Sequence, residues 1–261
     1  MNKNAVRQVV TLIAVAATIV VNLLANALPI NGQTTAEISD RFPVFFVPAG
    51  YVFSIWGLIY LGLLAYGVFQ ALPAQRDNPR LRRIDGLFVL GSVANIAWIL
   101  LWHYEQFPLT LVAMLVLLGA LIGVYLSLDI GRARVPSRER WLVHLPFSIY
   151  LGWITVATIA NATALLSYLE WDGWGIAPEV WAVIMLGAGV VLAVLMSLTR
   201  GDVAYLLVLV WAFVGIAVKH ADTTLVTVSA LIATALVLAA LAAGVILKGR
   251  RGGQTSLPTA A

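Results

Sequence analysis

Eight apolar segments, each about as long as a helix that crosses a bilayer, dominate this sequence. They lie near residues 6–28, 49–71, 84–103, 108–128, 141–168, 177–198, 202–219 and 223–247. Inside hydrocarbon, each backbone N–H and C=O group must be paired within the protein, and an uninterrupted apolar run achieves this as a helix. Only 11% of the residues are charged, against about a quarter in soluble domains. We therefore expect an all-α integral membrane protein with eight spans.

The basic residues predict how these spans are oriented. If the N-terminus is cytoplasmic, fourteen of the 16 Lys and Arg residues fall on the inner side, and only Arg41 and Lys219 fall outside. Such a bias is the positive-inside rule, so both termini are expected to be cytoplasmic. The net charge of +4 then reflects contact with the lipid bilayer and its anionic headgroups, and no nucleic-acid partner is expected. We expect a multi-pass protein of the bacterial inner membrane.

Several kinds of chemistry find no support in the sequence. The chain has no cysteine, and its three histidines, His103, His144 and His220, are far apart. No acidic or basic residue lies deep in a predicted span, although intramembrane enzymes and ion-coupled transporters generally need one there. We therefore expect no metal and no covalent cofactor, and the sequence gives no acid–base or nucleophile pattern that would indicate an enzyme.

Two connecting segments carry expectations of their own. Residues 29–48 form the longest outer connection and end in the apolar, aromatic stretch FPVFFVP. This segment is either a lid folded over the helix ends or a solvated linker, and its aromatic part favours the lid. Residues 249–261 are expected to be a disordered cytoplasmic tail.

Asparagine and aromatic residues recur at helical spacing within four spans. Because of the expected topology, most of these residues lie in the outer half of the membrane, beneath the 29–48 connection. Buried amides need partners, so they either hold helices together or line a cavity. The clustering favours a cavity, and the candidate ligand-binding residues are Asn22, Asn26, Phe53, Trp56, Tyr60, Asn95, Trp98, Tyr150, Trp153 and Asn161.

Three of these stretches resemble the tryptophan-rich sensory protein family (TspO/MBR), which includes the mitochondrial translocator protein. VPAGYVFSIWGLIY resembles the family's second-span motif through Pro48, Trp56 and Tyr60; ANIAWILLWHY resembles its third-span motif through Asn95 and Trp98. IYLGWITVATIAN resembles its fifth-span motif through Tyr150, Leu151, Trp153 and Asn161. The chain departs from the pattern at Gly50, where the family has tryptophan, and at Ile149, where it has proline.

The resemblance implies a five-helix bundle over residues 1–168, followed by three additional transmembrane helices over 169–248. It also implies a membrane receptor, carrier or sensor whose cavity binds a tetrapyrrole (porphyrin- or haem-like), a lipid or another hydrophobic small molecule, with Trp56 and Trp153 facing the ligand. Two alternatives remain open: light-dependent porphyrin degradation, and a structural role as a homodimer or as a subunit of a larger, pigment-containing membrane complex.

Overall fold

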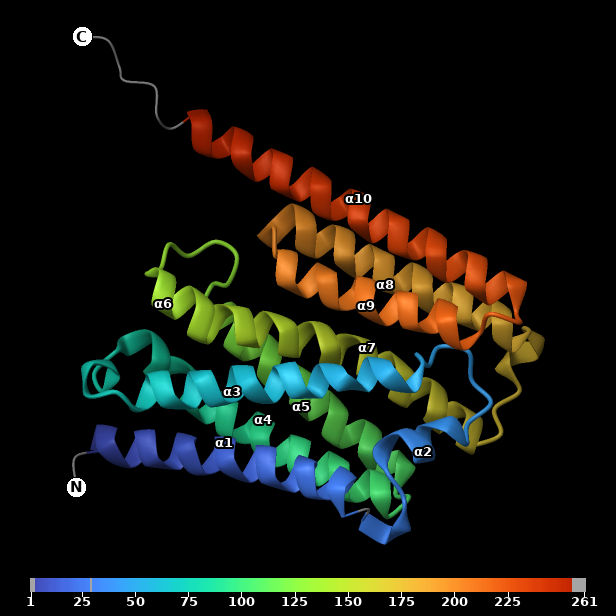
Figure 1. Cartoon of the computed structure of the whole chain (residues 1–261), viewed down its shortest axis with the longest axis horizontal. Coiled ribbons are helices and arrows are strands. Elements are labelled where there is room, and N and C mark those ends of the chain that lie inside the picture. The colour runs from blue at the N-terminus through green and yellow to red at the C-terminus, as the bar shows by residue number, and fades with distance from the viewer. Residues whose placement is uncertain (1–2, 29, 255–261) are drawn as a thin grey trace.

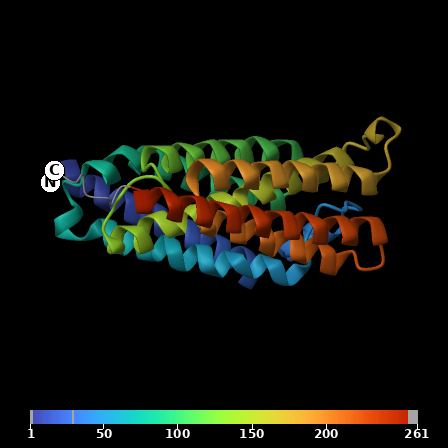
Figure 2. The same cartoon turned by 90° about the horizontal axis from the view of Figure 1, so that it is seen from above.

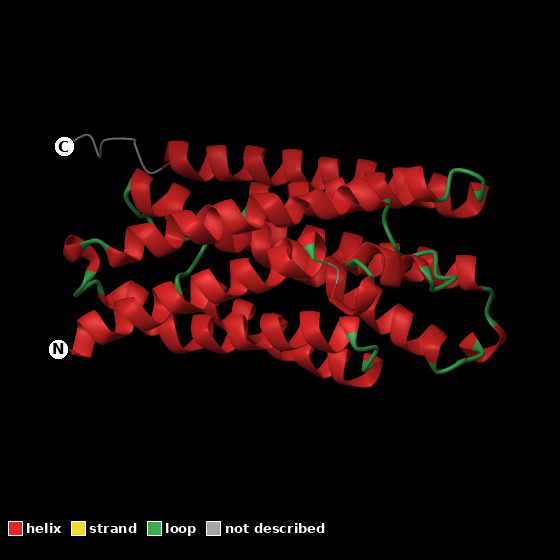
Figure 3. Cartoon of the chain, turned by 60° about the horizontal axis from the view of Figure 1, so that its bottom comes forward, coloured by secondary structure: helices red, strands yellow, loops and turns green. Residues whose placement is uncertain are grey.

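The computed structural model describes residues 3–28 and 30–254, and none of these residues lies in a strand (Figure 3). The long helices are α1 (Lys3–Ala27), α3 (Ile55–Ala71), α4 (Pro79–His103), α5 (Phe107–Ser127), α7 (Leu145–Tyr168), α8 (Pro178–Arg200), α9 (Val203–Lys219) and α10 (Thr224–Gln254). The short ones are α2 (Thr35–Asp40), α6 (Ser137–Glu139), the π-helical turn η4 (Arg140–His144) and four 3₁₀ turns, η1 (Ile30–Gly32), η2 (Gly50–Ser54), η3 (Pro73–Gln75) and η5 (Gly173–Gly175).

Each of the eight predicted segments corresponds to one long helix. Among the described residues, seven helical segments are long and apolar enough to cross a membrane, and α9, with 17 residues, is shorter. At 1.5 Å per residue α9 extends for about 26 Å, near the lower limit for a span. The all-α membrane class predicted from the sequence is thus confirmed, and the eight-span count depends on α9.

The long helices run roughly along one common axis (Figures 1 and 2). In the first part of the chain, α4 packs against α1 and α5, while α7 packs against α5 and α3. The last three helices form a layer on one side of this bundle, in which α8 and α10 pack against α9 and α9 packs against α7 (Figure 1). Helix α9 therefore carries the main contact between the last three helices and the rest of the protein.

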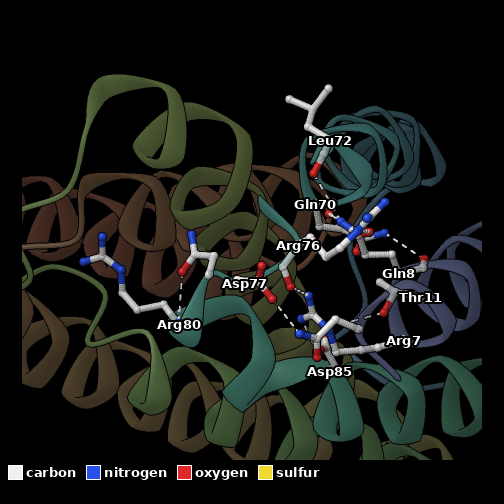
Figure 4. A network of polar contacts seen from close by, with 11 residues as sticks. Arg7, Gln8, Thr11, Gln70, Leu72, Arg76, Asp77, Arg80 and Asp85 are labelled. Carbon is white, nitrogen blue, oxygen red and sulfur yellow. Dashed lines mark hydrogen bonds and ion pairs between the residues drawn. The ribbon is translucent and has the colours of Figure 1, made fainter. Parts of the chain in front are cut away.

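We call the end of the molecule where α1 begins the basic end, since the arginine-rich connections gather there. A polar network joins three segments at this end (Figure 4). The guanidinium of Arg7 donates to the carboxylate of Asp85 at 2.5 Å, linking α1 to α4. The side chains of Gln8 and Gln70 each donate to the other residue's backbone carbonyl, at 2.6 and 3.1 Å, linking α1 to α3. These bonds partner polar groups that would otherwise be costly to bury.

Buried aromatic rings fill the adjoining core. Tyr66 of α3 lies with its ring centroid 5.1 Å from that of Phe88 on α4 and 5.0 Å from that of Phe147 on α7, both in edge-on contacts. Such edge-on contacts stabilise the core beyond the contribution of the surface area that the rings bury. They fix the spacing of α3, α4 and α7, the three helices that also surround the candidate site.

The expected disordered tail needs a correction. Helix α10 continues to Gln254, so residues 249–254 are helical, and residues 255–261 lie outside the described part of the chain.

Close packing at a glycine brings α9 against the segment that leads into α3. A Cβ atom on Gly215 would lie 2.2 Å from the side chain of Val52 and 3.1 Å from that of Pro48. The backbone N–H of Ala49 donates to the carbonyl of Gly215 at 3.0 Å. Gly189 of α8 is similarly close to Phe213 of α9, whereas Gly187 faces open space.

We therefore predict opposite effects for two Gly→Ala substitutions. Gly215→Ala should lower the free energy of unfolding by about 1–3 kcal/mol, because the added methyl overpacks the contact with Val52. Gly187→Ala, the matched control, should be neutral or stabilising by up to about 1 kcal/mol, as helix propensity implies. Thermal unfolding in detergent measures both, and equal midpoints for the two variants would contradict this account of α9 packing.

Candidate functional site

The connection between α1 and α3 folds over the helix ends, and we call residues 30–48 the lid. Its helix α2 begins with a capping box, in which Thr34 and Glu37 bond reciprocally. The backbone N–H and the hydroxyl of Thr34 hold the pKa of Glu37 below its usual value. Ile38, Phe46 and Val47 of the lid are buried, which agrees with a lid and not with a solvated linker.

The lid is attached on one side to α9. Asp40 forms an ion pair with Lys219, and the ring of Phe45 lies 5.2 Å from that of His220. Burial lowers the pKa of His220, so the ring is neutral at pH 7, and its Nε2–H donates to the carbonyl of Val47 at 3.2 Å. The C-terminal end of α9 thus holds one edge of the lid.

On its other side the lid is attached to α4. Arg41 pairs with Glu105 at 2.9 Å, in the turn after α4, and the indole N–H of Trp102 donates to the carbonyl of Thr35 at 3.2 Å. Arg41 and Lys219 are the two basic residues that the charge distribution leaves on the outer side. Both form ion pairs that hold the lid, which accounts for their position.

A small cavity of about 50 Å³ lies beneath the lid, between α3, α4 and α7. Its wall is mainly apolar and contains four tryptophans. Five of the ten predicted site residues line it: Phe53, Trp56, Trp98, Trp153 and Asn161. The other lining residues are Thr35, Ser39, Val47, Pro48, Trp102, Val156, Ala157 and Ala160.

The tryptophans form two groups on opposite walls. On α4, Trp98 and Trp102 stack with centroids 5.5 Å apart and an interplanar angle of 21°. Across the cavity, Trp153 of α7 meets Trp56 and Phe53 edge-on, at 6.3 and 5.8 Å. These rings make the wall largely aromatic, which is suited to a flat, apolar ligand.

Two buried polar atoms of the lining residues, the hydroxyl of Thr35 and the indole nitrogen of Trp153, have no partner among the described residues. Trp153 is 3% exposed, and its indole Nε1 makes no hydrogen bond with any residue the structure describes. Leaving a buried N–H unpaired costs about 1–3 kcal/mol. An acceptor on a ligand, or a water molecule, would remove that cost.

Five predicted residues belong to two separate hydrogen-bonded chains that tie the helices together. The amide of Asn22 on α1 donates to Asn95 on α4 at 2.6 Å, and Asn95 donates to the hydroxyl of Tyr150 on α7 at 3.0 Å. Nearer the cavity, the indole of Trp98 donates to Asn161 at 3.1 Å. Asn161 in turn donates to Thr110 of α5 at 2.9 Å, so it both lines the cavity and bonds two helices.

The predicted site residues are thus divided between the cavity wall and other places in the bundle. Asn22, Asn95 and Tyr150 are not among the lining residues, and their polar groups form bonds between helices. Tyr60 stacks on Trp56 at 5.7 Å, one turn farther along α3. Asn26 is exposed and donates to the carbonyl of Asn22 in its own helix, so it is not part of the site.

Several lining residues are missing from the predicted set. Trp102 follows Trp98 by one helical turn, so the same periodicity could have identified it. Thr35 and Ser39 come from the lid, whose contacts the sequence leaves undefined. Among the described residues, no group of three His, Asp or Glu side chains lies close enough to hold a metal ion.

A bundle of membrane-spanning helices with a lidded, tryptophan-lined cavity defines the class to which this protein belongs. Comparison with known families then identifies it: residues 8–247 match the family described as TSPO-like protein, and the chain belongs to that family. The match extends through α8, α9 and most of α10, so it is wider than the 1–168 bundle expected from the motifs. No curated protein and no solved structure matches the chain.

The hydrogen-bonded chain through Asn95 yields a prediction about stability. Asn95→Leu should lower the free energy of unfolding by about 1–3 kcal/mol, because it leaves Asn22 and Tyr150 without their shared partner in a buried site. The control Asn26→Leu removes an amide of the same kind from an exposed position and should change stability little. Unfolding by titration of a denaturing detergent measures both, and equal losses for the two variants would contradict the bridging role of Asn95.

Proposed function

We propose that this protein is a membrane receptor, carrier or sensor that binds a porphyrin-like hydrophobic ligand in the cavity beneath the lid. One observation carries the proposal: Phe53, Trp56, Trp98, Trp153 and Asn161, chosen from sequence pattern and family motifs, line the same cavity from three helices. Ligand pockets of this kind are mostly apolar, with few polar groups that fix orientation.

The chemistry of the cavity wall supports a flat macrocycle as the ligand. Four indole rings provide aromatic surface, while the unpaired N–H of Trp153 provides a hydrogen-bond donor. A macrocycle with acceptor groups at its edge satisfies both kinds of contact. The hydroxyl groups of Thr35 and Ser39 add polar contacts on the lid side.

The volume of the cavity implies a conformational change on binding. At about 50 Å³ it holds a few water molecules, whereas pockets for drug-sized ligands have about 300–1,000 Å³. We therefore propose that the structure corresponds to a closed state and that the lid must move for the ligand to enter. Exposed ion pairs such as Asp40–Lys219 are worth about 0–1 kcal/mol, so releasing them costs little.

The binding site is tested by titrating protoporphyrin IX into the purified protein and following tryptophan fluorescence. Trp56→Phe and Trp153→Phe should each weaken binding about two- to tenfold, because an aromatic contact contributes about 0.5–1.5 kcal/mol beyond its buried area. Trp174→Phe is the control, since this residue is 76% exposed and lies in the connection after α7. Affinities that are the same in all three variants would refute the assignment of the site.

The role of the lid is tested by association kinetics. Lys219→Met should speed protoporphyrin IX binding up to about fivefold, because removing the ion pair with Asp40 lowers the cost of lid opening by at most about 1 kcal/mol. Arg83→Met removes the same charge from an exposed site at the basic end and should leave the rate unchanged. Stopped-flow fluorescence measures both rates, and a rate for Lys219→Met no faster than the control would contradict lid-limited entry.

A further inference from the structure

A second cavity, of about 430 Å³, lies at the basic end, far from the lid. Its wall is formed by the connection from α5 to α6, the π-helical turn η4 and the turn from α8 to α9. Three arginines line it, Arg132, Arg134 and Arg140, and its one acidic residue is Asp202. A cavity with this excess of positive charge favours an anion.

The carboxylate of Asp202 offsets only one of these three positive charges, and its oxygens are bonded to groups inside the protein. It accepts hydrogen bonds from the hydroxyl of Ser148 at 2.6 Å and from that of Tyr125 at 2.8 Å. It also caps α9 by accepting from the backbone N–H of Tyr205 at 3.2 Å. Asp202 therefore shapes the wall, and its negative charge is stabilised by three donors.

The arginines, by contrast, are available to a ligand. Within the described part of the chain, Arg134 and Arg140 form no salt bridge, and both are exposed. Arg132 is held in place by a bond from its Nε to the carbonyl of Thr199 at 2.9 Å, which leaves the end of its guanidinium group for other contacts. Arg140 begins the π-helical turn, a rare feature that is frequent at functional sites.

An apolar groove of about 420 Å³ continues from this cavity along the bundle. The two share Leu145 and Ala204 in their linings, so the basic cavity leads directly into the groove. Leu145 and Ile149 of α7 form its floor, and α3 and α9 form its walls. Leu58, Leu207 and Trp211 along the groove are about 38–52% exposed, so it is open on the side that faces lipid.

We propose that the basic cavity and the groove form one binding site for an anionic phospholipid of the leaflet at the basic end. The phosphate lies against Arg134 and Arg140, and one acyl chain lies in the groove between α3 and α9. Arginine guanidinium groups bind phosphate through paired N–H donors. A soluble anion would leave the groove unused, and a lipid without net charge would leave the arginines without a partner.

The site does not depend on the proposed porphyrin cavity, because none of the residues that line the cavity or the groove lines the cavity beneath the lid. The two sites lie at successive levels along α7. Ile149 faces the groove, whereas Trp153, one turn later, faces the lidded cavity.

The test measures lipid retained by the full chain in nanodiscs that contain phosphatidylglycerol and phosphatidylcholine, followed by native mass spectrometry after transfer to detergent. The double variant Arg134→Gln/Arg140→Gln should bind phosphatidylglycerol about thirtyfold more weakly, which corresponds to about 1 kcal/mol for each arginine. The double variant Arg82→Gln/Arg83→Gln is the control, since it removes the same charge from the basic end outside the cavity.

A second pair of variants tests the groove. Ala204→Leu fills the junction between cavity and groove and should reduce retention, whereas Ala188→Leu, at an exposed position on α8, should not. Each variant is first compared with the natural protein by thermal unfolding, and the arginine variants decide the result if Ala204→Leu does not fold.

Three results would overturn the proposal. The first is equal phosphatidylglycerol retention in the two double-arginine variants. The second is equal retention of phosphatidylcholine and phosphatidylglycerol by the natural protein, which indicates an unselective lipid annulus. The third is displacement of the lipid by millimolar inorganic phosphate or glycerol 3-phosphate, which indicates a soluble-anion site.

Discussion

The requirement that polar groups within a bilayer find partners inside the protein governs how these helices are placed. Two layers of hydrogen bonds between helices satisfy this requirement. At the basic end, Arg7 and Gln8 of α1 bind groups on α4 and α3. Toward the lid, Asn95 joins α1 to α7, and Asn161 joins α4 to α5. Apolar packing between helices is weakly directional in lipid, so these bonds define which helices are neighbours.

Helix α9 adds a constraint that a five-helix bundle lacks. It packs closely on α7 at Gly152, where an added Cβ would lie 3.1 Å from Val208. Toward its C-terminal end it contacts the segment around Val52 through Gly215, and its Trp211 donates to the carbonyl of Val52 at 3.0 Å. Helix α9 is therefore part of the support for the lid and for the start of α3.

The sequence pattern identified the helices and the residues that share a helix face, but it did not identify which helices contact one another. The apolar segments predicted every long helix, and three- and four-residue spacing placed Phe53 with Trp56, and Trp153 with Asn161, on faces that line one cavity. Spacing alone does not distinguish an asparagine that lines a cavity from one that bonds another helix. The bond between Asn22 and Asn95 could not be predicted in this way, since the two residues are 73 positions apart in sequence. The residues that join the lid to α9, such as Asp40 and Lys219, are separated by even more of the sequence.

Helix α7 links the lidded cavity to the lipid-facing groove. Gly152 contacts α9, while the next residue, Trp153, lines the cavity with an unpaired indole N–H. A ligand too large for about 50 Å³ must displace either the lid or α7. Both are in direct contact with α9, through Lys219 on one side and Val208 on the other. Helix α9 therefore connects the lid, α7 and the groove, of which it is a wall.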